Sequence, residues 1–494
     1  MDRLEKFLKG KLEESPGTNC YWWKGQWRTR RDLADLVVHS RRTLEESGFR
    51  EGMRLGLMMP NCPMVLALSI AAWSLGGAVA PLNLRSGFEG LMRLISMLDL
   101  HGVAFMEDRP EIGEGLKQAG IPSSPCGLEG PLRPFTGRGA SQLDLPDVAV
   151  IFSTSGTTGL PKAVPISHRN IMSNVTAVID HVEFLRPGEV LLNALPNFHT
   201  LGYSVAGMLP LIGEMSQAII PSFIPPDQAL AAINAAAVTG IIAVPTMISM
   251  LVGSVARGGE RPRGVNFVIS GGDKLNVEMD RRCGELLGAP ILEGYGLTEC
   301  SPVVAVNRSY DKRRLGTVGP IVKGYEWQIR DLNDNLLEDG SEGVLWVKGP
   351  SVTAGYFRDR ENTQARFRDG WFNTGDVVRI DPDGYVTILD RATDIIIVGG
   401  FNVYPQEVEL CLLEHPAVAA AVAVGERNSM TGEVVKAFVV LKEGASASPR
   451  DIIDFAKDKL PHFKVPRKVV ILPELPISST GKVSRRALRE MDAQ

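Results

Sequence analysis

The sequence predicts an α/β protein with a large N-terminal domain of parallel sheets covered by helices, including a small β section, followed by a small α+β domain. Three observations support this fold class. Short uncharged runs alternate with helical stretches up to about residue 300, which is typical of parallel sheets buried on both faces. Beyond about residue 310, strands separated by turns predict a smaller antiparallel section. At 494 residues the chain also exceeds the ~250–300 residues at which single cores stop growing.

The N-terminal part begins with a predicted helix at 30–48, where Leu33, Leu36, Val37 and Leu44 recur on one face among charged residues. An apolar run after Arg54 then predicts a strand at 54–59, and uncharged, β-prone runs predict strands at 78–82, 103–106, 148–152, 190–195, 218–221, 241–244, 265–270 and 290–292. Residues 109–146 are rich in glycine and proline, and we expect them to form an irregular connection.

Two stretches without any charge, 55–84 and 228–256, raise the alternative of a membrane span. Proline and glycine interrupt both of them, which disfavours a continuous spanning helix. We therefore expect a buried helix at 64–75 that leads through a turn into the strand at 78–82. The second stretch predicts helix, strand and helix in that order.

The part after residue 310 supplies the small β section and the second domain. Strands are predicted at 343–347, 376–380 and 384–389. The tail predicts strands at 394–398, 418–424, 434–441 and 468–472 and helices at 405–414, 449–460 and 484–491. Pro405 and Pro449 stand where the first turn of a helix accepts proline. We place the domain boundary at 391/392, which gives domains 1–391 and 392–494.

Composition limits the functional classes. The net charge of −4 gives no electrostatic argument for binding nucleic acid or a membrane surface, although peripheral membrane contact stays open. The six cysteines are scattered without a CxxC pair, which favours a reducing compartment. The charged N-terminus has no apolar core and does not read as a signal peptide, so we expect a cytoplasmic protein.

The most informative stretch is 152–162, FSTSGTTGLPK, which follows the buried strand predicted at 148–152. Glycines, hydroxyl side chains and Lys162 after such a strand are suited to cradle phosphate. The alternative is a plain surface loop. A Walker loop is excluded because Pro161 precedes Lys162 and Ala163 follows it.

Other motifs carry weaker signals when each is taken alone. At 294–299, GYGLTE follows a predicted strand, so Tyr295 is suited to stack on a flat ligand and Glu299 to bind Mg²⁺; the alternative is a strand-to-turn junction with a solvated acid. At 371–376, Asp376 comes just after a glycine turn and is suited to accept two ribose hydroxyls, unless it only caps that turn.

Three further motifs have equally ordinary alternatives. Residues 399–405, GGFNVYP, follow the first strand of the tail and are suited to line a narrow tunnel, or they form an ordinary strand-to-helix loop. Lys482 ends SSTGK and is either a lysine that reaches another domain or a surface lysine. His199 in PNFH either lines an acyl pocket or is a structural histidine whose ring nitrogens form ordinary hydrogen bonds.

Together and in this order, these motifs resemble the superfamily of adenylate-forming enzymes, which includes acyl-CoA synthetases, peptide-synthetase adenylation domains and firefly-type luciferases. The resemblance runs over nearly the whole chain, from 60–83 through STSGTTGLPK, PNFH, GYGLTE, GWFNTGD and 390–409 to SSTGK. It implies a mobile C-terminal domain, ATP and Mg²⁺, a carboxylic acid that is joined to AMP with release of pyrophosphate, and transfer of the acyl group to the thiol of CoA.

The resemblance also implies roles for particular residues. The catalytic set is Lys482, Thr298, Glu299 and His199, with Glu299 also binding the metal. The loop set for the pyrophosphate end is Thr154, Ser155, Gly156, Thr157, Thr158, Gly159 and Lys162. The remaining nucleotide and thiol positions are Gly272, Asp273, Lys274, Glu293, Gly294, Tyr295, Gly296, Asp376, Ile388, Arg391, Gly399 and Gly400.

Three positions bear on how far the resemblance extends. Ala163 replaces the usual glycine, a small change, whereas Thr393 stands where the family usually has its Lys or Asp pivot. His199 replaces the Asp of amino-acid-activating members, which disfavours an amino-acid substrate. The apolar stretch 201–211 favours a medium- or long-chain fatty acid. The open alternatives are an aryl or alicyclic acid, an acyl carrier protein as the acceptor, and a non-catalytic nucleotide-binding homologue.

Overall fold

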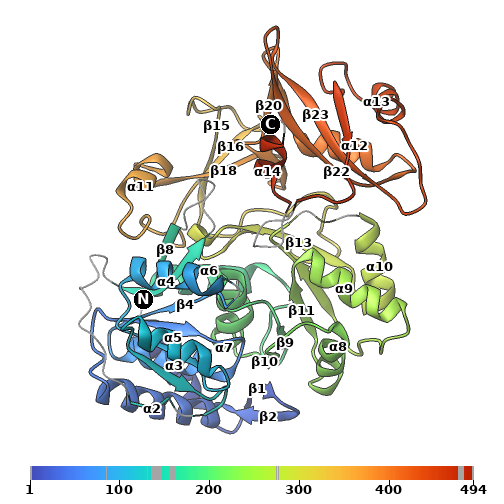
Figure 1. Cartoon of the computed structure of the whole chain (residues 1–494). Helices are drawn as coiled ribbons and strands as arrows, with labels where there is room; N and C mark the ends of the chain where they lie inside the picture. Colours follow the sequence, from blue (N-terminus) through green and yellow to red (C-terminus); the bar gives the residue numbers. More distant parts are fainter. Residues whose placement is uncertain are drawn as a thin grey trace. The chain divides into compact units, whose positions relative to one another are not determined.

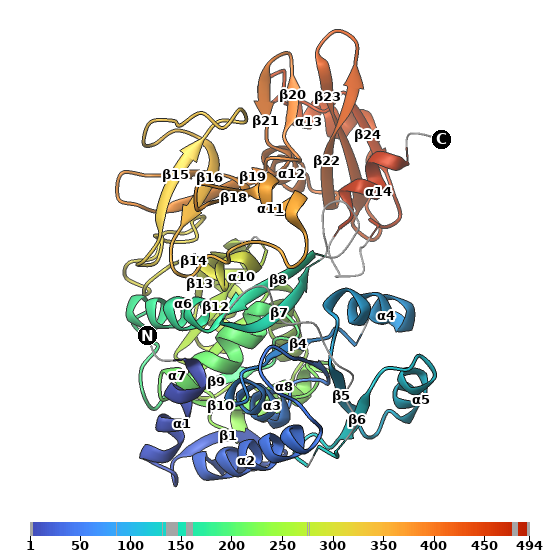
Figure 2. The same ribbon diagram turned by 90° about the vertical axis from the view of Figure 1, so that its left-hand side faces the viewer.

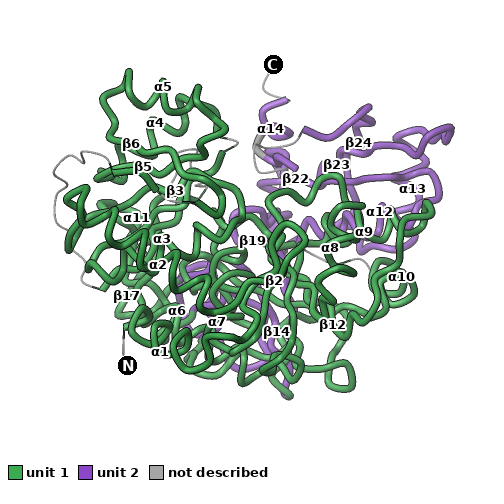
Figure 3. Tube along the Cα trace, turned by 90° about the horizontal axis from the view of Figure 1, so that it is seen from below, with its two compact units in different colours: residues 1–327, 347–372, 383–386 green, residues 328–346, 373–382, 387–494 purple. Residues whose placement is uncertain are grey.

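The computed structural model describes residues 3–84, 86–130, 132–134, 147–154, 162–273, 275, 277–476 and 483–491 (Figure 1). Its contacts divide the chain into two compact units (Figure 3). Unit 1 comprises residues 1–327, 347–372 and 383–386, and unit 2 comprises residues 328–346, 373–382 and 387–494. The boundary at 391/392 stays a prediction.

The first sheet of unit 1 has six strands in the order β6-β5-β3-β4-β7-β8. Its strands are β3 (Arg54–Met58), β4 (Ala78–Pro81), β5 (Gly102–Met106), β6 (Ser123–Cys126), β7 (Val148–Thr154) and β8 (Lys162–Ser167). All neighbours are parallel except β7 and β8, which form an antiparallel pair. Helices α3 (Pro63–Ser74), α4 (Gly87–Leu98) and α5 (Pro110–Gln118) connect successive parallel strands (Figure 2).

The second sheet of unit 1 has eight strands in the order β14-β13-β12-β11-β9-β10-β1-β2. Its strands are β1 (Asn19–Trp23), β2 (Gln26–Thr29), β9 (Val190–Asn193), β10 (Ser216–Ile219), β11 (Gly240–Ala243), β12 (Phe267–Ser270), β13 (Ile291–Gly296) and β14 (Val303–Val306). The six strands from β13 to β1 are parallel, and the edge strands β14 and β2 are antiparallel to their neighbours.

Helices complete the packing of unit 1. They are α1 (Leu4–Glu14), α2 (Arg30–Glu46), α6 (His168–His181), α7 (Leu209–Ile212), α8 (Pro226–Ala235), α9 (Pro245–Ala256), α10 (Val277–Leu287), a π-helix η1 (Leu201–Met208) and a 3₁₀ turn η2 (Thr298–Cys300). Helix α3 is buried on all sides and packs against α1 and α2, which explains why its sequence lacks any polar face. Among the residues described, no helix is long and apolar enough to cross a membrane.

A five-stranded sheet follows, with β15 (Glu326–Arg330), β16 (Gly343–Lys348), β17 (Phe367–Arg368), β18 (Trp371–Ile380) and β19 (Val386–Arg391). Its order is β15-β16-β18-β17, and β19 pairs with β18. The short helix α11 (Arg360–Arg366) precedes β17. This sheet contains the three strands that the sequence predicts for the β section.

The tail of unit 2 has its own sheet and core. Strands β20 (Ile396–Val398), β21 (Phe401–Val403), β22 (Val418–Asn428), β23 (Gly432–Leu441) and β24 (Lys468–Ile471) pair in the order β21-β20-β23-β22, with β24 on β23. Helices α12 (Pro405–Leu413) and α13 (Pro449–Lys457) pack against this sheet, and α14 (Arg485–Glu490) packs against β22. The core includes Ile396, Val408, Leu412, Val439 and Ile452. The predicted α/β fold class is confirmed.

Four local predictions are wrong. The segment 109–146 is not irregular throughout, because Ile112 and Leu116 bury one face of α5 and β6 pairs with β5. GYG does not follow the strand predicted at 290–292 but is itself the end of β13, and Asp376 does not follow a turn, because residues 371–376 belong to β18 with Gly375 at φ +74° inside the strand.

The fourth correction concerns Gly399 and Gly400. They do not begin a strand-to-helix loop but form a two-residue hairpin turn, since Val398 on β20 pairs with Phe401 on β21. Their φ values of +60° and +87° explain the two glycines, because a hairpin turn of this kind places both residues in the left-handed region.

Candidate active site

Several predicted motifs of unit 1 meet at one edge of the eight-stranded sheet. PNFH follows β9, Gly271 and Gly272 follow β12, and Gly294 lies in the last part of β13. Because these strands are parallel, their carboxyl ends share an edge, where open α/β sheets bind ligands. A Cβ added to Gly271 would lie 3.4 Å from the Gly294 carbonyl oxygen and 4.0 Å from Leu201. The structure therefore brings these three motifs together.

Gly272 is the most open of these positions. It is exposed, adopts φ +88°, and among the described residues a Cβ there would meet only Val244, at 3.5 Å. Asp273 beside it is exposed, while Glu293 and Tyr295 on β13 are half-buried. This edge thus offers glycine backbone and the Tyr295 ring to a flat ligand.

A second group joins the β7–β8 hairpin to η2. The Lys162 ammonium lies 4.9 Å from the centre of the Tyr356 ring, and the Tyr356 hydroxyl donates a 2.7 Å hydrogen bond to Oε1 of Glu299. The backbone holds the same elements together, since Phe357 N–H donates to the Ala163 carbonyl and Thr353 N–H donates to the Glu299 carbonyl, each at 2.8 Å. The lysine and the carboxylate, far apart in sequence, thus meet across one tyrosine.

Burial sets the protonation of this group. It lowers the pKa of Lys162, with the neighbouring Arg366 acting in the same direction. It also raises the pKa of Tyr356 well above its usual range, and the Glu299 carboxylate adds to that shift. The tyrosine therefore keeps its proton as the hydrogen-bond donor at neutral pH.

Glu299 fits the requirement of a Mg²⁺ ligand. Its carboxylate is half-buried and has one oxygen on Tyr356, and a hard cation prefers such an oxygen donor. Among the residues that the structure describes, no three His, Cys, Asp or Glu side chains cluster as a metal site. Proteins often supply a single carboxylate to Mg²⁺, because the ion usually keeps water molecules and substrate phosphates as its other ligands.

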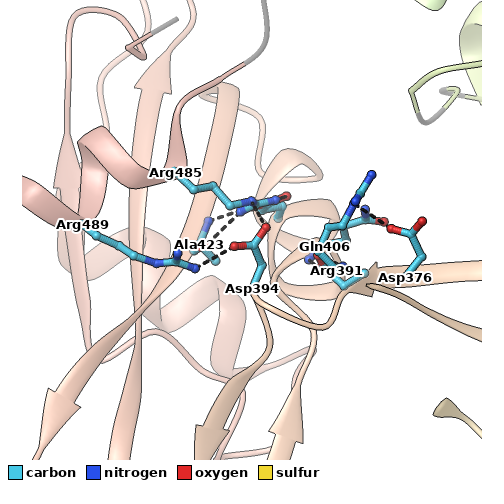
Figure 4. Close-up of polar contacts among 9 residues, drawn as sticks. Asp376, Arg391, Asp394, Gln406, Ala423, Arg485 and Arg489 are labelled. Atoms are coloured by element: carbon cyan, nitrogen blue, oxygen red, sulfur yellow. Dashed lines mark hydrogen bonds and ion pairs between the residues drawn. The ribbon is translucent and has the colours of Figure 1, made fainter. Parts of the chain in front are cut away.

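Unit 2 contains the Asp376–Arg391 pair, whose Oδ1 and Nε atoms are 2.6 Å apart (Figure 4). The Asp376 side chain is 4% exposed and that of Arg391 is 51% exposed. Asp376 is fixed by its strand, because its N–H donates to Thr374 Oγ1 and the Thr374 hydroxyl donates to the Leu345 carbonyl. A buried acceptor beside a half-exposed guanidinium is suited to bind a pair of hydroxyl groups.

The other unit 2 positions lie near this pair in sequence. Ile388 is half-buried on β19, and the exposed hairpin turn carries Gly399 and Gly400. A Cβ at either glycine would meet nothing within 4 Å in the part of the chain that the structure describes, so the turn conformation itself accounts for the two glycines.

His199 lies at the corner between β9 and η1, where its exposed ring contacts Phe198 at 4.7 Å between ring centres. In unit 1, Thr154 pairs with Lys162 across the hairpin, and Thr298 begins η2. Ser155, Gly156, Thr157, Thr158, Gly159, Lys274 and Lys482 lie outside the described residues.

Sequence reasoning missed a buried amide network that includes Asn197, two residues before His199. Asn61 donates to Asn193 Oδ1 at 3.1 Å, Asn197 donates to the same oxygen at 3.0 Å, and Asn193 donates to Gln217 Oε1 at 2.8 Å. All four amide side chains are at most 4% exposed. The available signal was the single polar residue of the otherwise apolar run 190–195, Asn193.

The same network braces the π-helix η1. Asn197 donates to the Gly202 carbonyl at 3.0 Å and Gln217 donates to the Gly207 carbonyl at 3.1 Å. Glycine is required at 202 because a Cβ there would lie 2.2 Å from the Pro196 carbonyl oxygen. Isolated π-helical turns are rare and frequent at functional sites. Tyr356 was also missed, since nothing in its local sequence indicates a partner 57 positions away.

Two mostly parallel α/β sheets, with glycine-rich motifs at the carboxyl edge of the strands of one of them, are typical of nucleotide-binding α/β proteins. The chain belongs to the AMP-binding enzyme family: the model of that family matches residues 8–357, and the model of the family's C-terminal domain matches residues 407–482. The resemblance to adenylate-forming enzymes is confirmed.

Known relatives show how far the similarity extends. The chain is 35% identical to a long-chain-fatty-acid–CoA ligase of Bacillus subtilis over 355 residues, which cover 70% of this chain and 62% of that ligase. It is 29% identical to a feruloyl-CoA synthase of an Amycolatopsis species over 96% of both chains. The chain thus spans less than two thirds of the long-chain ligase it matches.

Solved structures agree with the fold. ATP-bound MatB from Rhodopseudomonas palustris superposes with a TM-score of 0.86 at 30% identity over 99% of both chains. The o-succinylbenzoate CoA synthetase of Bacillus subtilis, in complex with its acyl-adenylate, gives 0.82 at 26% identity over 98% of this chain and 97% of that one.

Proposed function

We propose that this chain is an AMP-forming acid–thiol ligase, which activates a carboxylic acid with ATP and then transfers the acyl group to CoA. The observation that carries the proposal is the meeting of Lys162 and Glu299 across Tyr356, beside the hairpin that follows the pattern of a phosphate loop. Family membership supports the same reaction class.

The chemistry explains why these residue types are needed. A free carboxylate is a poor acyl donor because its leaving group would be oxide, and attachment to AMP supplies a better one. The residues then have to hold the phosphate charge and orient the reactants. Lys162, with the loop 154–159, would hold the β- and γ-phosphates, and Thr298 and Glu299 would hold the metal end of the triphosphate. Mg²⁺, when bound, supplies further charge neutralisation.

The remaining roles follow the family pattern. Asp376 and Arg391 would bind the ribose hydroxyls, and Gly272, Tyr295 and Ile388 would surround the base, with Asp273, Lys274, Glu293, Gly294 and Gly296 alongside. Lys482 would stabilise charge at the acyl-phosphate junction in the first step only. The 399–400 turn would serve the thiol in the second step, after rotation of the C-terminal domain.

The preferred acid in this proposal is a medium- or long-chain fatty acid. The segment η1 is apolar and buried from Gly202 to Met208, and His199 stands where an amino-acid-activating enzyme would need an acid. Identity to long-chain-fatty-acid–CoA ligases supports the same choice. An aryl acid is the second candidate, because the feruloyl-CoA synthase matches over 96% of both chains.

The acceptor is CoA in this proposal, and an acyl carrier protein is the alternative. The six cysteines are all free, which supports a reducing compartment such as the cytoplasm. The boundary near 391/392 and a rotation of the C-terminal domain between the two half-reactions are part of the proposal. Unchanged adenylation and thioester formation after a crosslink locks the domains together would refute the rotation.

The test is carboxylate-dependent exchange of labelled pyrophosphate into ATP. The panel contains fatty acids of graded chain length and aryl acids, and product formation is measured with CoA and with a carrier protein. We expect exchange that rises with chain length and a thioester on CoA. Absence of exchange with every acid of the panel would refute the proposed ligase activity and favour a non-catalytic homologue.

A further inference from the structure

The linker between the β section and the tail, residues 390–394, forms hydrogen bonds or ion pairs with other parts of unit 2 at both of its ends. At its start, Asp390 is 3% exposed and accepts hydrogen bonds from Arg391 N–H at 2.8 Å and from Gln406 N–H at 3.0 Å. The second bond satisfies the first turn of α12, whose own N-cap residue Tyr404 makes no side-chain cap. Asp390 therefore caps α12 from outside that helix.

At the other end of the linker, Asp394 is held by the last helix (Figure 4). Arg489 on α14 donates to Asp394 Oδ1 at 2.8 Å, and Arg485 Nε lies 3.7 Å from Asp394 Oδ2. Thr393, the expected pivot, thus lies within a segment whose two ends are fixed to the tail.

Arg485 contacts both α12, which Asp390 caps, and the linker residue Asp394. Its guanidinium makes a two-pronged ion pair with Glu409 on α12, with Nη2 to Oε2 at 3.1 Å, and it donates to the Ala423 carbonyl on β22 at 2.9 Å. The Arg485 and Glu409 side chains are only 21% and 14% exposed. Glu409 also accepts from Ala423 N–H at 2.8 Å. Such a fork-to-fork pair fixes orientation as well as distance.

These contacts meet at one end of α14. Arg485 is the first residue of that helix, and Leu488, one turn later, is fully buried with Val422, Val424 and Phe438. In the sequence, Lys482 stands three positions before Arg485. Lys482 is therefore close in sequence to the first turn of α14.

We propose that Arg485 is a positioning residue, which joins the start of α14 to Glu409 and to the linker residue Asp394 so that linker, α12 and last helix move as one body. The inference rests on the proposed role of Lys482 in the first half-reaction. Arg485 would then act on catalysis through the placement of Lys482, without touching substrate itself.

The test compares Arg485→Ala, Arg485→Lys and Glu409→Gln with Arg450→Ala, an arginine on α13 whose side chain is 90% exposed. We expect Arg485→Ala to lower kcat for pyrophosphate exchange by ~10- to 100-fold through misplacement alone. The KM for ATP should stay within about threefold, and use of a supplied acyl-adenylate should be nearly unchanged. Arg485→Lys should be intermediate, and Arg450→Ala should match the parent.

A second measurement does not depend on activity. Hydrogen exchange of the amides of 484–491 should be faster in Arg485→Ala and Glu409→Gln than in the parent and in Arg450→Ala. Unchanged exchange of these amides, or an equal loss in both half-reactions, overturns the proposal. If the parent itself shows no pyrophosphate exchange with any acid, the proposed function fails. Hydrogen exchange then still decides whether Arg485 holds α14.

Discussion

The Tyr356 hydroxyl donates a 2.7 Å hydrogen bond to the Glu299 carboxylate, while the face of the same ring lies 4.9 Å from the Lys162 ammonium. One tyrosine thus orients the carboxylate by a directional bond and offers its π face to the cation. Its hydroxyl is held as a donor by burial, which raises its pKa. Three elements distant in sequence are thereby brought to one point.

Tyr356→Phe tests this relationship. The change keeps the ring beside Lys162 and removes only the bond that orients Glu299. We expect a ~10-fold lower kcat for pyrophosphate exchange and a higher Mg²⁺ requirement, because partners that orient a metal ligand typically contribute 10–100-fold. Mg²⁺ titrations of the exchange rate measure both effects. Tyr385→Phe, which removes a hydroxyl that donates to the Lys312 carbonyl, is the control and should have little effect.

Asp376→Ala tests the ribose role of the Asp376–Arg391 pair. Loss of a charged acceptor for two hydroxyls should raise the KM for ATP ~10- to 100-fold, since each such bond is worth about 1.5–3 kcal/mol. The control is Asp383→Ala, whose side chain is 68% exposed and pairs at the surface with Arg314. An unchanged KM in Asp376→Ala, with a folded protein by circular dichroism, would contradict the assignment.

Replacement of Lys162 and replacement of Lys482 should affect the two half-reactions differently. Lys482→Ala should abolish pyrophosphate exchange yet still convert a supplied acyl-adenylate into the thioester. Lys162→Ala should be less damaging, because the role proposed for Lys162 is to hold the phosphates that leave. Single-turnover assays of the two half-reactions measure each step separately. Equal loss of both half-reactions in Lys482→Ala would show that its role is not confined to the first step.

Gly296→Ala tests a close backbone approach next to the candidate base site. A Cβ at 296 would lie 2.1 Å from the carbonyl oxygen of Pro302, so the backbone has to shift. We expect a loss of about 1–3 kcal/mol in the free energy of unfolding, as for other overpacking changes. Gly10→Ala, in α1, where a Cβ would meet no described residue within 4 Å, should instead stabilise the protein by up to ~1 kcal/mol. Urea titrations followed by circular dichroism give both values.

His168 predicts an acid-sensitive component of stability. Burial, with the nearby Arg3 charge, lowers its pKa from 6.5 to about 3. The folded state thus keeps the ring neutral while the unfolded state binds a proton below pH 6.5, so stability falls as the pH is lowered. Between neutral pH and pH 5 this amounts to about 2 kcal/mol. His168→Gln should reduce that slope in denaturant titrations at pH 7.5 and 5, and an identical slope would contradict the assignment.

The sequence alone determined the elements whose signals are local. The spacing of Leu33, Val37 and Leu44 predicted α2, and uncharged runs predicted parallel strands such as β7, β11 and β12, because charged side chains are rare in strands that are buried on both faces. The order of short motifs predicted the family, and Pro405 and Pro449 located two helix starts in the tail. These features depend on residues within a few positions of one another.

Only the tertiary structure decided the features that depend on partners far along the chain. Gly399 and Gly400 read as a loop until the pairing of Val398 with Phe401 made them a hairpin turn. Tyr356 meets Glu299 across 57 positions, Asn61 meets Asn193 across 132, and Arg485 meets Glu409 across 76. A side chain's hydrogen-bond capacity can be read from sequence, but its partner is chosen by how strands and helices pack. For that reason the sequence could predict the motifs proposed to bind phosphate, whereas the residues that contact Lys162 and Glu299 appear only in the folded chain.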